Sequence, residues 1–277
     1  VASNFSFLTQ VVEMRRLIQV LIVVASINTT VLAQESGAVV YAAGSLREAL
    51  TEIAAIWVAQ GRPAPTLVFG ASGLLRKRIE QGEPAQVFAS ADMGHPQALA
   101  TQGGWVSPVV FTRNVLCALV QPSVNISSQT FLATLLRSDI RVGTSTPRAD
   151  PSGDYAFTLF NRAESLIPGS SKQLEAKALL LTGGPNSLSP PTGRGTYAWL
   201  MDSNQADVFL TYCTNAVAAQ REVSRLRVIA IPSELQVGAD YGLTFRQSAS
   251  NEAKEFVQFL RSTPAQAVLM RLGFGST

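Results

Sequence analysis

The sequence predicts an α/β fold in which mainly parallel sheets are covered by helices. The first observation behind this prediction is that short apolar runs alternate with stretches whose apolar residues recur at helical spacing. The second is a turn of small residues containing a serine, which lies between a strand and a helix at three places in the chain. The geometry of these units recurs, although no sequence repeat of about 20–50 residues is evident.

The first of these turns interrupts an apolar stretch near the start of the predicted fold. Val39–Ala43 is typical of a buried strand, and it breaks at Gly44-Ser45. A helix is predicted from Ser45 to about Gln60, with one apolar face formed by Leu46, Ala49, Leu50, Ile53, Ala54 and Trp57. A strand that ends where a helix begins leaves unpaired N–H groups and the positive end of the helix dipole at one spot, which suits an anion.

Two further units repeat this pattern. Thr66–Phe69 is predicted as a strand, and Gly70-Ala71-Ser72-Gly73 opens the next helix. Ile140–Thr144 is predicted as a strand that leads to Ser152-Gly153, followed by a helix over residues 154–163. Because ligands of open α/β sheets bind beyond the carboxyl ends of the strands, we expect these turns to converge.

The rest of the chain supplies the other predicted elements. Val87–Ala91 is a third strand that runs into a polar turn at residues 92–96, and Val109–Val120 is either a strand pair or one long strand. We also expect strands at 208–212, 227–231 and 241–245, helices at 129–136 and 251–260, a short helix around Tyr197–Met201, a loop at 182–195, and a last helix opened by Ser262-Thr263-Pro264.

The first 33 residues predict a secretory leader. Met14-Arg15-Arg16 precedes the apolar run Leu17–Ile27, and Val31-Leu32-Ala33 is a small-residue cleavage pattern. The apolar run is short for a membrane span. We therefore expect a signal peptide at about residues 14–33, with translation starting at Met14, and an exported, periplasmic protein.

Export permits a disulfide, and the chain has two cysteines, Cys117 and Cys213. Both lie in apolar runs that are typical of strands. The sequence leaves open whether they are bonded or are two buried thiols, because it does not give the distance between their Cα atoms. No metal-ligand spacing and no dinucleotide-binding Gly-x-Gly-x-x-Gly motif is present, so no metal or cofactor is expected.

Charge and histidine content argue against two function classes. The net charge is +3 with scattered Lys and Arg, which gives no basic stripe for nucleic acid. An exposed serine after a strand also occurs in hydrolases, but no Gly-x-Ser-x-Gly motif surrounds Ser45, Ser72 or Ser152. His95, the single histidine, lies in a predicted surface turn, so we predict no catalytic residue.

The serines have a structural alternative. Ser45-Leu46-Arg47-Glu48 matches a capping box, in which the serine hydroxyl bonds the helix backbone and the glutamate reaches back. Three such turns in parallel-sheet units instead favour a ligand, since neutral hydroxyls and N–H groups can hold an anion.

Several segments, taken in order, resemble the periplasmic molybdate-binding proteins of ABC importers over about residues 38–274. They are Tyr41-Ala-Ala-Gly-Ser-Leu46, Phe69-Gly-Ala-Ser-Gly73, Phe88-Ala-Ser-Ala-Asp92, Asp150-Pro-Ser-Gly153 with Tyr155-Ala156, Gly193-Arg-Gly195, Tyr212 within its strand, and Arg271-Leu-Gly-Phe274. The resemblance implies the two-lobed, class II periplasmic binding fold, with two strands crossing between the lobes. Residues 38–112 plus 243–277 would form the first lobe, and residues 113–242 the second.

In that family a tetrahedral oxyanion binds between the lobes. The resemblance implies that Ser45 and Ser72 contact it through hydroxyl and N–H, that the backbone at Ser152 and Gly193 contacts it from the second lobe, and that the hydroxyl of Tyr212 does so as well. Ser152 and Gly193 stand where relatives have alanine and valine. Since backbone donors serve there, the changes need not abolish binding.

The implied function is a monomeric receptor that captures molybdate, and also tungstate, and delivers it to an ABC permease in the inner membrane. Three alternatives remain at this stage. The same fold could bind sulfate, phosphate or a small organic anion; the chain could be an exported α/β hydrolase-like enzyme; or it could be a ligand-sensing domain that signals to a partner.

Overall fold

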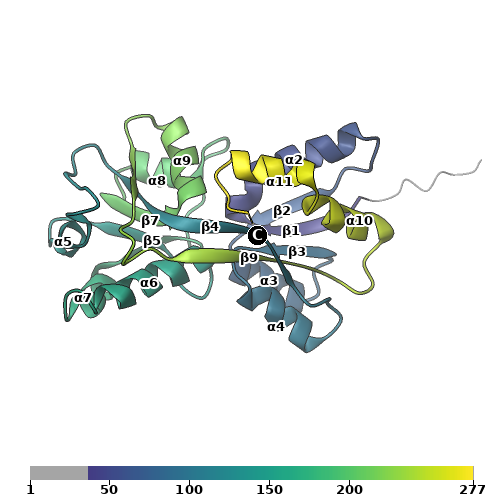
Figure 1. Cartoon of the computed structure of the whole chain (residues 1–277), viewed down its shortest axis with the longest axis horizontal. Helices are drawn as coiled ribbons and strands as arrows, with labels where there is room; N and C mark the ends of the chain where they lie inside the picture. The colour runs from purple at the N-terminus through teal and green to yellow at the C-terminus, as the bar shows by residue number, and fades with distance from the viewer. Residues whose placement is uncertain (1–36, 277) are drawn as a thin grey trace, which may run out of the picture. The chain divides into compact units, whose positions relative to one another are not determined.

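A computed structural model describes residues 37–276, so the predicted leader lies outside the described residues. These residues form an α/β structure in which helices cover both faces of a curled, mixed sheet (Figure 1). No helix in this part of the chain is long and apolar enough to cross a membrane.

The sheet has nine strands in the order β2-β1-β3-β9-β4-β7-β5-β6, and β8 pairs with β4. The strands are β1 (Val39–Ala43), β2 (Thr66–Gly70), β3 (Val87–Ser90), β4 (Val109–Val120), β5 (Val142–Ser145), β6 (Leu179–Thr182), β7 (Val208–Tyr212), β8 (Arg227–Ala230) and β9 (Gly238–Phe245). The helices are η1 (Gly44–Leu46), α2 (Arg47–Ala59), α3 (Ser72–Glu80), α4 (Gly94–Gln102), α5 (Phe131–Leu136), α6 (Pro151–Ala163), α7 (Ser170–Lys177), α8 (Thr196–Asp202), α9 (Cys213–Glu222), α10 (Asn251–Leu260) and α11 (Thr263–Arg271).

The first lobe consists of β1–β3 with η1, α2–α4, α10 and α11. β1 lies between β2 and β3 and is parallel to both. The apolar face of α2 packs into the core as its spacing predicts, and Trp57 stacks edge-on against Phe256 of α10 with ring centroids 5.4 Å apart. The second lobe consists of β5–β8 with α5–α9, and β5 is parallel to both β6 and β7.

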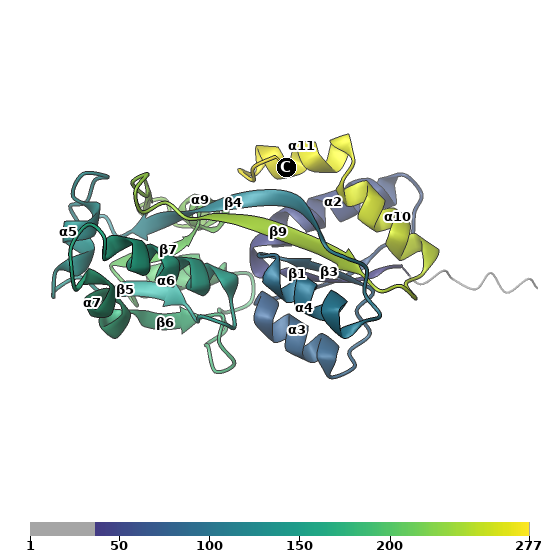
Figure 2. The same cartoon turned by 60° about the horizontal axis from the view of Figure 1, so that its bottom comes forward.

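Two strands connect the lobes. β4 and β9 run antiparallel along one another, and Figure 2 shows them passing from one lobe to the other. β9 also pairs with β3 in the first lobe, while β4 pairs with β7 and β8 in the second. Residues 109–120 are therefore one long strand, and the predicted fold class is confirmed. The exact lobe boundaries remain a prediction.

Some elements differ from the sequence-based expectation. The predicted polar turn at 92–96 opens α4, and α7, β6 and α9 were not predicted. These helices bury few large apolar residues: α4 buries Pro96 and Leu99, and α9 buries Ala216 and Ala219. Such faces give little apolar periodicity, which explains why the sequence pattern does not reveal them.

The two cysteines are joined by a disulfide, with Cα atoms 4.7 Å apart. Cys117 lies on β4 as predicted, whereas Cys213 is the first residue of α9 and does not lie in a strand. The bond ties the beginning of α9 to a strand that crosses between the lobes. It therefore also fixes the position of the preceding residue, Tyr212.

Candidate functional site

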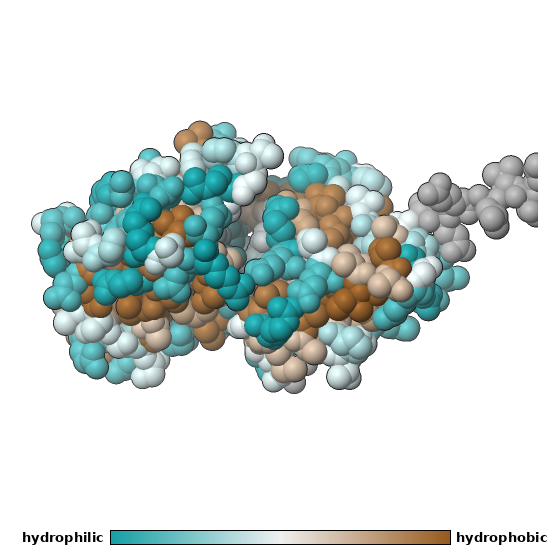
Figure 3. All heavy atoms as spheres, turned by 90° about the horizontal axis from the view of Figure 1, so that it is seen from above, coloured by the Kyte–Doolittle hydropathy of each residue, from teal (hydrophilic) through white to brown (hydrophobic). Residues whose placement is uncertain are grey.

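A cavity of about 780 Å³ lies between the lobes. The first lobe lines it with the ends of β1 and β2, the helix starts that follow these two strands, and Ala91 directly after β3. The second lobe contributes the loop after β6, the start of α8 and the end of β7. Figure 3 shows the surface indented where the two lobes meet. Ser45, Ser72, Gly193 and Tyr212 all line this one cavity, whereas Ser152 does not.

Ser45 does not cap a helix. It lies inside η1, neither η1 nor α2 has a side-chain cap, and Glu48 pairs with Arg221 of α9 at 3.2 Å. The capping-box prediction is therefore wrong, because the chain enters α2 through a tight helical turn that already contains the serine. The Ser45 hydroxyl instead lies 2.9 Å from the hydroxyl of Tyr241 on β9.

A chain of hydrogen bonds fixes the direction of the Ser45 hydroxyl. The amide Nδ2 of Asn114 donates to the Tyr241 hydroxyl at 3.3 Å. Either hydroxyl can be the donor in the contact between Ser45 and Tyr241; when Tyr241 donates its proton to Ser45 Oγ, the Ser45 proton is free for a ligand. Asn114 and Tyr241 are buried on the two crossing strands, so they hold the donor rigidly.

Ser72 is oriented in a similar way at the start of α3. Its Oγ accepts a hydrogen bond from the N–H of Ala91 at 3.1 Å, and the side chain is 1% exposed. Since the oxygen is held as an acceptor, the hydroxyl proton remains available to an acceptor in the cavity. The two serines thus present two preorganised donors from one lobe.

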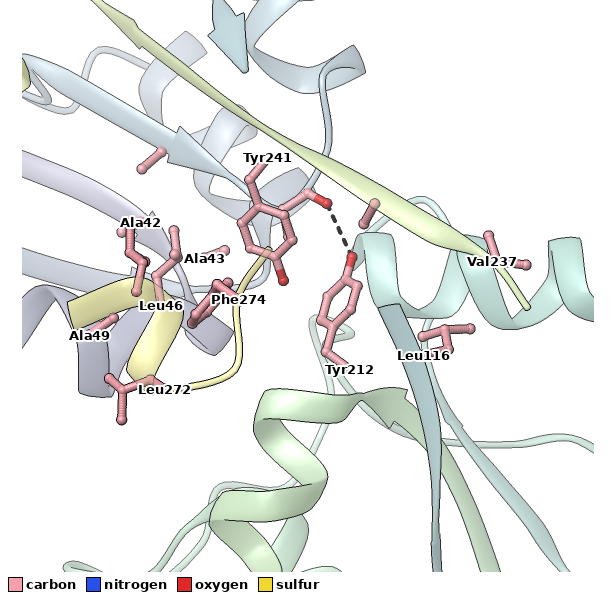
Figure 4. Packing of buried hydrophobic residues seen from close by; sticks show 14 of the residues in the cluster. Ala42, Ala43, Leu46, Ala49, Leu116, Tyr212, Val237, Tyr241, Leu272 and Phe274 are labelled. Carbon is pink, nitrogen blue, oxygen red and sulfur yellow. Dashed lines mark hydrogen bonds between the residues drawn. The ribbon is translucent and has the colours of Figure 1, made fainter. Parts of the chain in front are cut away.

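Tyr212 reaches the first lobe from the end of β7. Its hydroxyl donates to the carbonyl oxygen of Ala91 at 3.1 Å, as the dashed line in Figure 4 marks. Its ring packs against Tyr241, with centroids 5.4 Å apart. Burial raises the pKa of Tyr212 well above its ordinary value, so the hydroxyl stays a neutral donor. Ala91 therefore bonds a side chain from each lobe.

A second contact between the lobes lies beside Ser72. The N–H of Gly73 donates to the carbonyl oxygen of Ala149 at 2.9 Å. A Cβ at position 73 would meet the carbonyl oxygens of Arg148 and Ala149 at 2.5 and 2.8 Å. Only glycine permits this approach, so the lobes touch directly at the edge of the cavity.

Ser152 is placed differently from the expectation. Its side chain is completely buried, and its N–H donates to the carboxylate of Asp150, 3.1 Å away, which caps α6. Its Oγ has no hydrogen-bond partner among the described residues. The cavity wall at this point is Asp150 itself. A ligand contact to the backbone at Ser152 would have to displace this carboxylate, and it remains a prediction.

Gly193 lies in the loop before α8, in the left-handed region with φ +83°. The N–H groups that follow are already engaged, because Arg194 donates to Pro191 and Gly195 donates to Glu222. Arg194 also forms ion pairs with Glu222 and with Asp202, at 2.5 and 3.0 Å. The arginine is therefore structural.

Five charged residues line the cavity: Arg47, Glu48, Asp150, Arg194 and Glu222. Arg194, Glu222 and Glu48 are paired as described above. Arg47 and Asp150 have no ion-pair partner within residues 37–276, and the guanidinium of Arg47 stacks 4.5 Å from the ring centre of Phe69. Burial raises the pKa of Asp150 to about 6, although the N–H of Ser152 and the hydroxyl of Ser145 favour its ionised form.

His95 has no place at this cavity. It lies in the first turn of α4, where Nε2 is 3.8 Å from the Asp92 carboxylate, and its side chain is 13% exposed. The prediction of a surface turn residue is therefore wrong. Burial lowers the pKa of His95. The serines of the cavity thus have no histidine base beside them, and no group of acidic, His or Cys side chains in the described part of the chain could hold a metal ion.

The sequence pattern did not indicate Tyr241, Asn114 or Asp150 as site residues. Tyr241 and Asn114 lie on the crossing strands, more than 40 positions from either serine, and become neighbours only when β4 pairs with β9. Asp150 had a usable signal: Asp followed by Pro and Ser is typical of a helix N-terminus. That Asp150 also lines the cavity depends on the tertiary structure and cannot be read from the sequence.

Comparison with known proteins shows what this arrangement is similar to. The sequence model of one family, described as bacterial extracellular solute-binding protein, matches residues 38–275. An uncharacterized protein of Pasteurella multocida is 39% identical over 205 residues, which cover 74% of this chain and 85% of that protein. The molybdate-binding protein ModA of Escherichia coli is 26% identical, covering 88% of this chain and 90% of its own.

Two solved structures show the same fold. The periplasmic molybdate-binding protein of Azotobacter vinelandii superposes with a TM-score of 0.69 at 18% identity, covering 87% of this chain and 99% of that one. The sulfate-binding protein SubI of Mycobacterium tuberculosis also gives a TM-score of 0.69, at 17% identity, with 88% of each chain covered. At these identities the similarity concerns the fold alone.

Proposed function

The chain belongs to the family of bacterial extracellular solute-binding proteins, and we propose that it is a periplasmic receptor that captures a tetrahedral oxyanion, molybdate or tungstate, between its lobes and delivers it to an ABC permease. The family consists of solute-binding proteins, which are not enzymes. We propose accordingly that the ligand is held and released without chemical change, by a protein that acts as a monomer.

One observation carries this proposal. Ser45 and Ser72 follow two parallel strands, and each hydroxyl oxygen is positioned by a hydrogen bond: Ser72 Oγ accepts from the N–H of Ala91, and Ser45 Oγ can accept from Tyr241, so that both protons can point to the cavity. An oxyanion accepts hydrogen bonds and donates none when fully deprotonated, so it matches such donors. Gly193 and Tyr212 are the proposed contacts from the second lobe; the Tyr212 hydroxyl, which donates to the Ala91 carbonyl oxygen in this structure, would turn its proton to the ligand. Arg47, unpaired at the cavity wall, adds a positive charge that attracts an anion.

Binding between the lobes would allow the permease to recognise a receptor that carries its ligand. A bound anion contacts both lobes, so it stabilises the arrangement in which they touch. The permease can then distinguish loaded from empty receptor by the closed arrangement. Selection against sulfate would come from the size of the oxyanion. The donors are fixed on two lobes, so an anion forms all of its hydrogen bonds only if its oxygen atoms are far enough apart to reach every donor.

A small organic anion is a second candidate ligand. The cavity volume of about 780 Å³ lies within the range of sites for small organic molecules and exceeds what a single tetrahedral anion needs. Three hydroxyl-bearing residues also line it: Thr182 at the end of β6, and Ser187 and Ser189 in the loop that follows. These could bind an organic extension of a phosphate.

Calorimetry on protein from which bound anion has been removed tests both candidates. The titrants are molybdate, tungstate, sulfate, phosphate and glycerol phosphate. Saturation by molybdate and tungstate, with sulfate at least about 100-fold weaker, would support the first candidate. Binding of glycerol phosphate with no response to molybdate would replace it by the second. A ligand at about 100 times its Kd should also stabilise the protein by about 2.7 kcal/mol in thermal unfolding.

A further inference from the structure

A carboxylate in the wall of a cavity built for an anion is unexpected. Asp150 lines the cavity as the N-cap of α6, a helix of 13 residues, and its carboxylate accepts the N–H of Ser152 at 3.1 Å. This N–H is one of the donors that the resemblance assigns to the oxyanion. The chain's own carboxylate thus occupies the helix N-terminus that would otherwise face the ligand.

A second observation at the same helix start points to a missing partner. The Oγ of Ser152 is completely buried and has no hydrogen-bond partner among the described residues. A buried hydroxyl without a partner is costly and calls for an explanation, such as a bound water, an ion or a catalytic role. The start of α6 therefore holds a hydroxyl that Asp150 does not satisfy, behind the part of the wall that Asp150 forms.

The groups that face Asp150 do not neutralise it. Asp154 lies on its own helix, Asp92 lies across the cleft, and both raise its pKa. The other ionisable neighbours are three tyrosines that stay neutral: Tyr197 of α8, Tyr212 of β7 and Tyr241 of β9. Within residues 37–276, no Lys, Arg or His forms an ion pair with Asp150.

The backbone holds Asp150 firmly in this place. Gly183, with φ +77°, passes so close that a Cβ there would lie 2.5 Å from Asp150 Cβ and 2.6 Å from its Oδ2. The side chain has little room to turn away when an anion enters. A dianion in the cavity must therefore share the cavity with this carboxyl group.

We propose that Asp150 is a specificity-determining residue of the anion cavity, which opposes a fully deprotonated dianion when ionised and accepts a proton from solvent when the dianion binds. The inference rests on the proposed function and goes beyond it. Protonated Asp150 loses its negative charge and becomes a hydrogen-bond donor to the anion. Each captured dianion then brings one proton into the complex.

The sign of the pH dependence follows from the two states. The pKa of Asp150 is raised to about 6 in the free protein, and a bound dianion raises it further. Between these two values the complex binds more protons than the free protein, so affinity falls as pH rises. We expect molybdate to bind about 5-fold more tightly at pH 6 than at pH 8.

The test is calorimetry with sodium molybdate and sodium tungstate at pH 6 and pH 8, on the wild-type protein and two variants. Asp150→Asn keeps an effective N-cap of the same size and removes the charge. It should bind about 10-fold more tightly than wild type at pH 8, with less than about 2-fold change between the two pH values. Asp139→Asn is the matched control, because it makes the same charge change in the second lobe, while Asp139 neither lines the cavity nor contributes to the pKa shift of Asp150. It should keep the wild-type pH dependence.

Proton uptake gives a measurement that needs no variant. Titrations of the wild-type protein at pH 7 in buffers of different ionisation enthalpy should show net uptake of protons, up to about one per anion. Absence of uptake, or equal affinities of wild type and D150N at pH 8, would show that Asp150 is only a helix cap and would overturn the inference. Sulfate and phosphate are titrated in parallel. If the wild-type protein binds none of the four anions, the proposed function fails, whereas anion binding without proton uptake refutes this inference alone.

Discussion

Replacing Gly73 by alanine should weaken ligand binding by preventing the lobes from touching. The added Cβ would lie 2.5 Å from the carbonyl oxygen of Arg148 and 2.8 Å from that of Ala149. Both are backbone atoms of the second lobe, so the clash cannot be relieved by turning a side chain. The lobes must separate at this edge, and the hydrogen bond from Gly73 N–H to Ala149 O is lost.

The magnitude follows from the contacts that are lost. One backbone hydrogen bond contributes about 0.5–1.5 kcal/mol, and the Tyr212 bond to Ala91 across the same edge should weaken as the lobes separate. A penalty of about 1–2 kcal/mol on the closed arrangement lowers the affinity about 5- to 30-fold. The free protein should not be destabilised in its first lobe, because alanine is a better helix former than glycine within α3.

The assay is calorimetry with molybdate, together with small-angle scattering with and without ligand. Gly94→Ala is the control variant, because Gly94 also lies in the first turn of a helix of the first lobe, and its nearest neighbour to a new Cβ is 3.7 Å away. The control should bind as the wild type does. If Gly73→Ala binds with wild-type affinity and contracts normally on adding ligand, contact at this edge is not required for capture.

Three further predictions concern the site and its support. Ser45→Ala should fold normally, since Ser45 caps no helix, and should bind oxyanion about 10-fold more weakly because one oriented donor is lost; unchanged affinity in calorimetry would exclude a ligand role. Tyr212→Phe removes the hydroxyl that reaches the first lobe and should lower affinity to a similar degree, while tryptophan fluorescence of the free protein stays native; a variant that binds normally would show that this hydroxyl serves only packing. Reduction of the Cys117–Cys213 bond, which spans 96 positions, should lower the free energy of unfolding by about 2–5 kcal/mol; identical denaturation curves with and without reductant would contradict this.

The strand-to-helix turns were predictable because they depend on neighbours in the chain. An apolar run, a turn of small residues with a serine and a helical apolar face set each turn locally, so the sequence alone places Ser45 and Ser72 at helix starts. The parallel pairing of β1 with β2 and β3 then places these turns at one edge. The elements the pattern missed, α4, α7, β6 and α9, lack a strong apolar period or large buried side chains.

Tertiary structure alone decided how the hydroxyls are used. Ser45 is oriented by Tyr241, 196 positions away, and Ser72 by the N–H of Ala91. The capping-box prediction is wrong because the folded protein brings another partner within reach of Glu48. Its carboxylate forms an ion pair with Arg221 of the other lobe.

The sequence by itself determined the α/β class, the succession of most strands and helices, and the serine turns between strand and helix at Ser45 and Ser72. It could not determine which donors remain free, because that depends on hydrogen bonds between residues far apart in the chain. Nor could it show that Asp150 and Gly73 lie where the two lobes meet. Local periodicity encodes which face of each element is buried. Whether a polar group still has a free hydrogen-bond donor or acceptor is fixed only when all of its neighbours in the folded protein are in place.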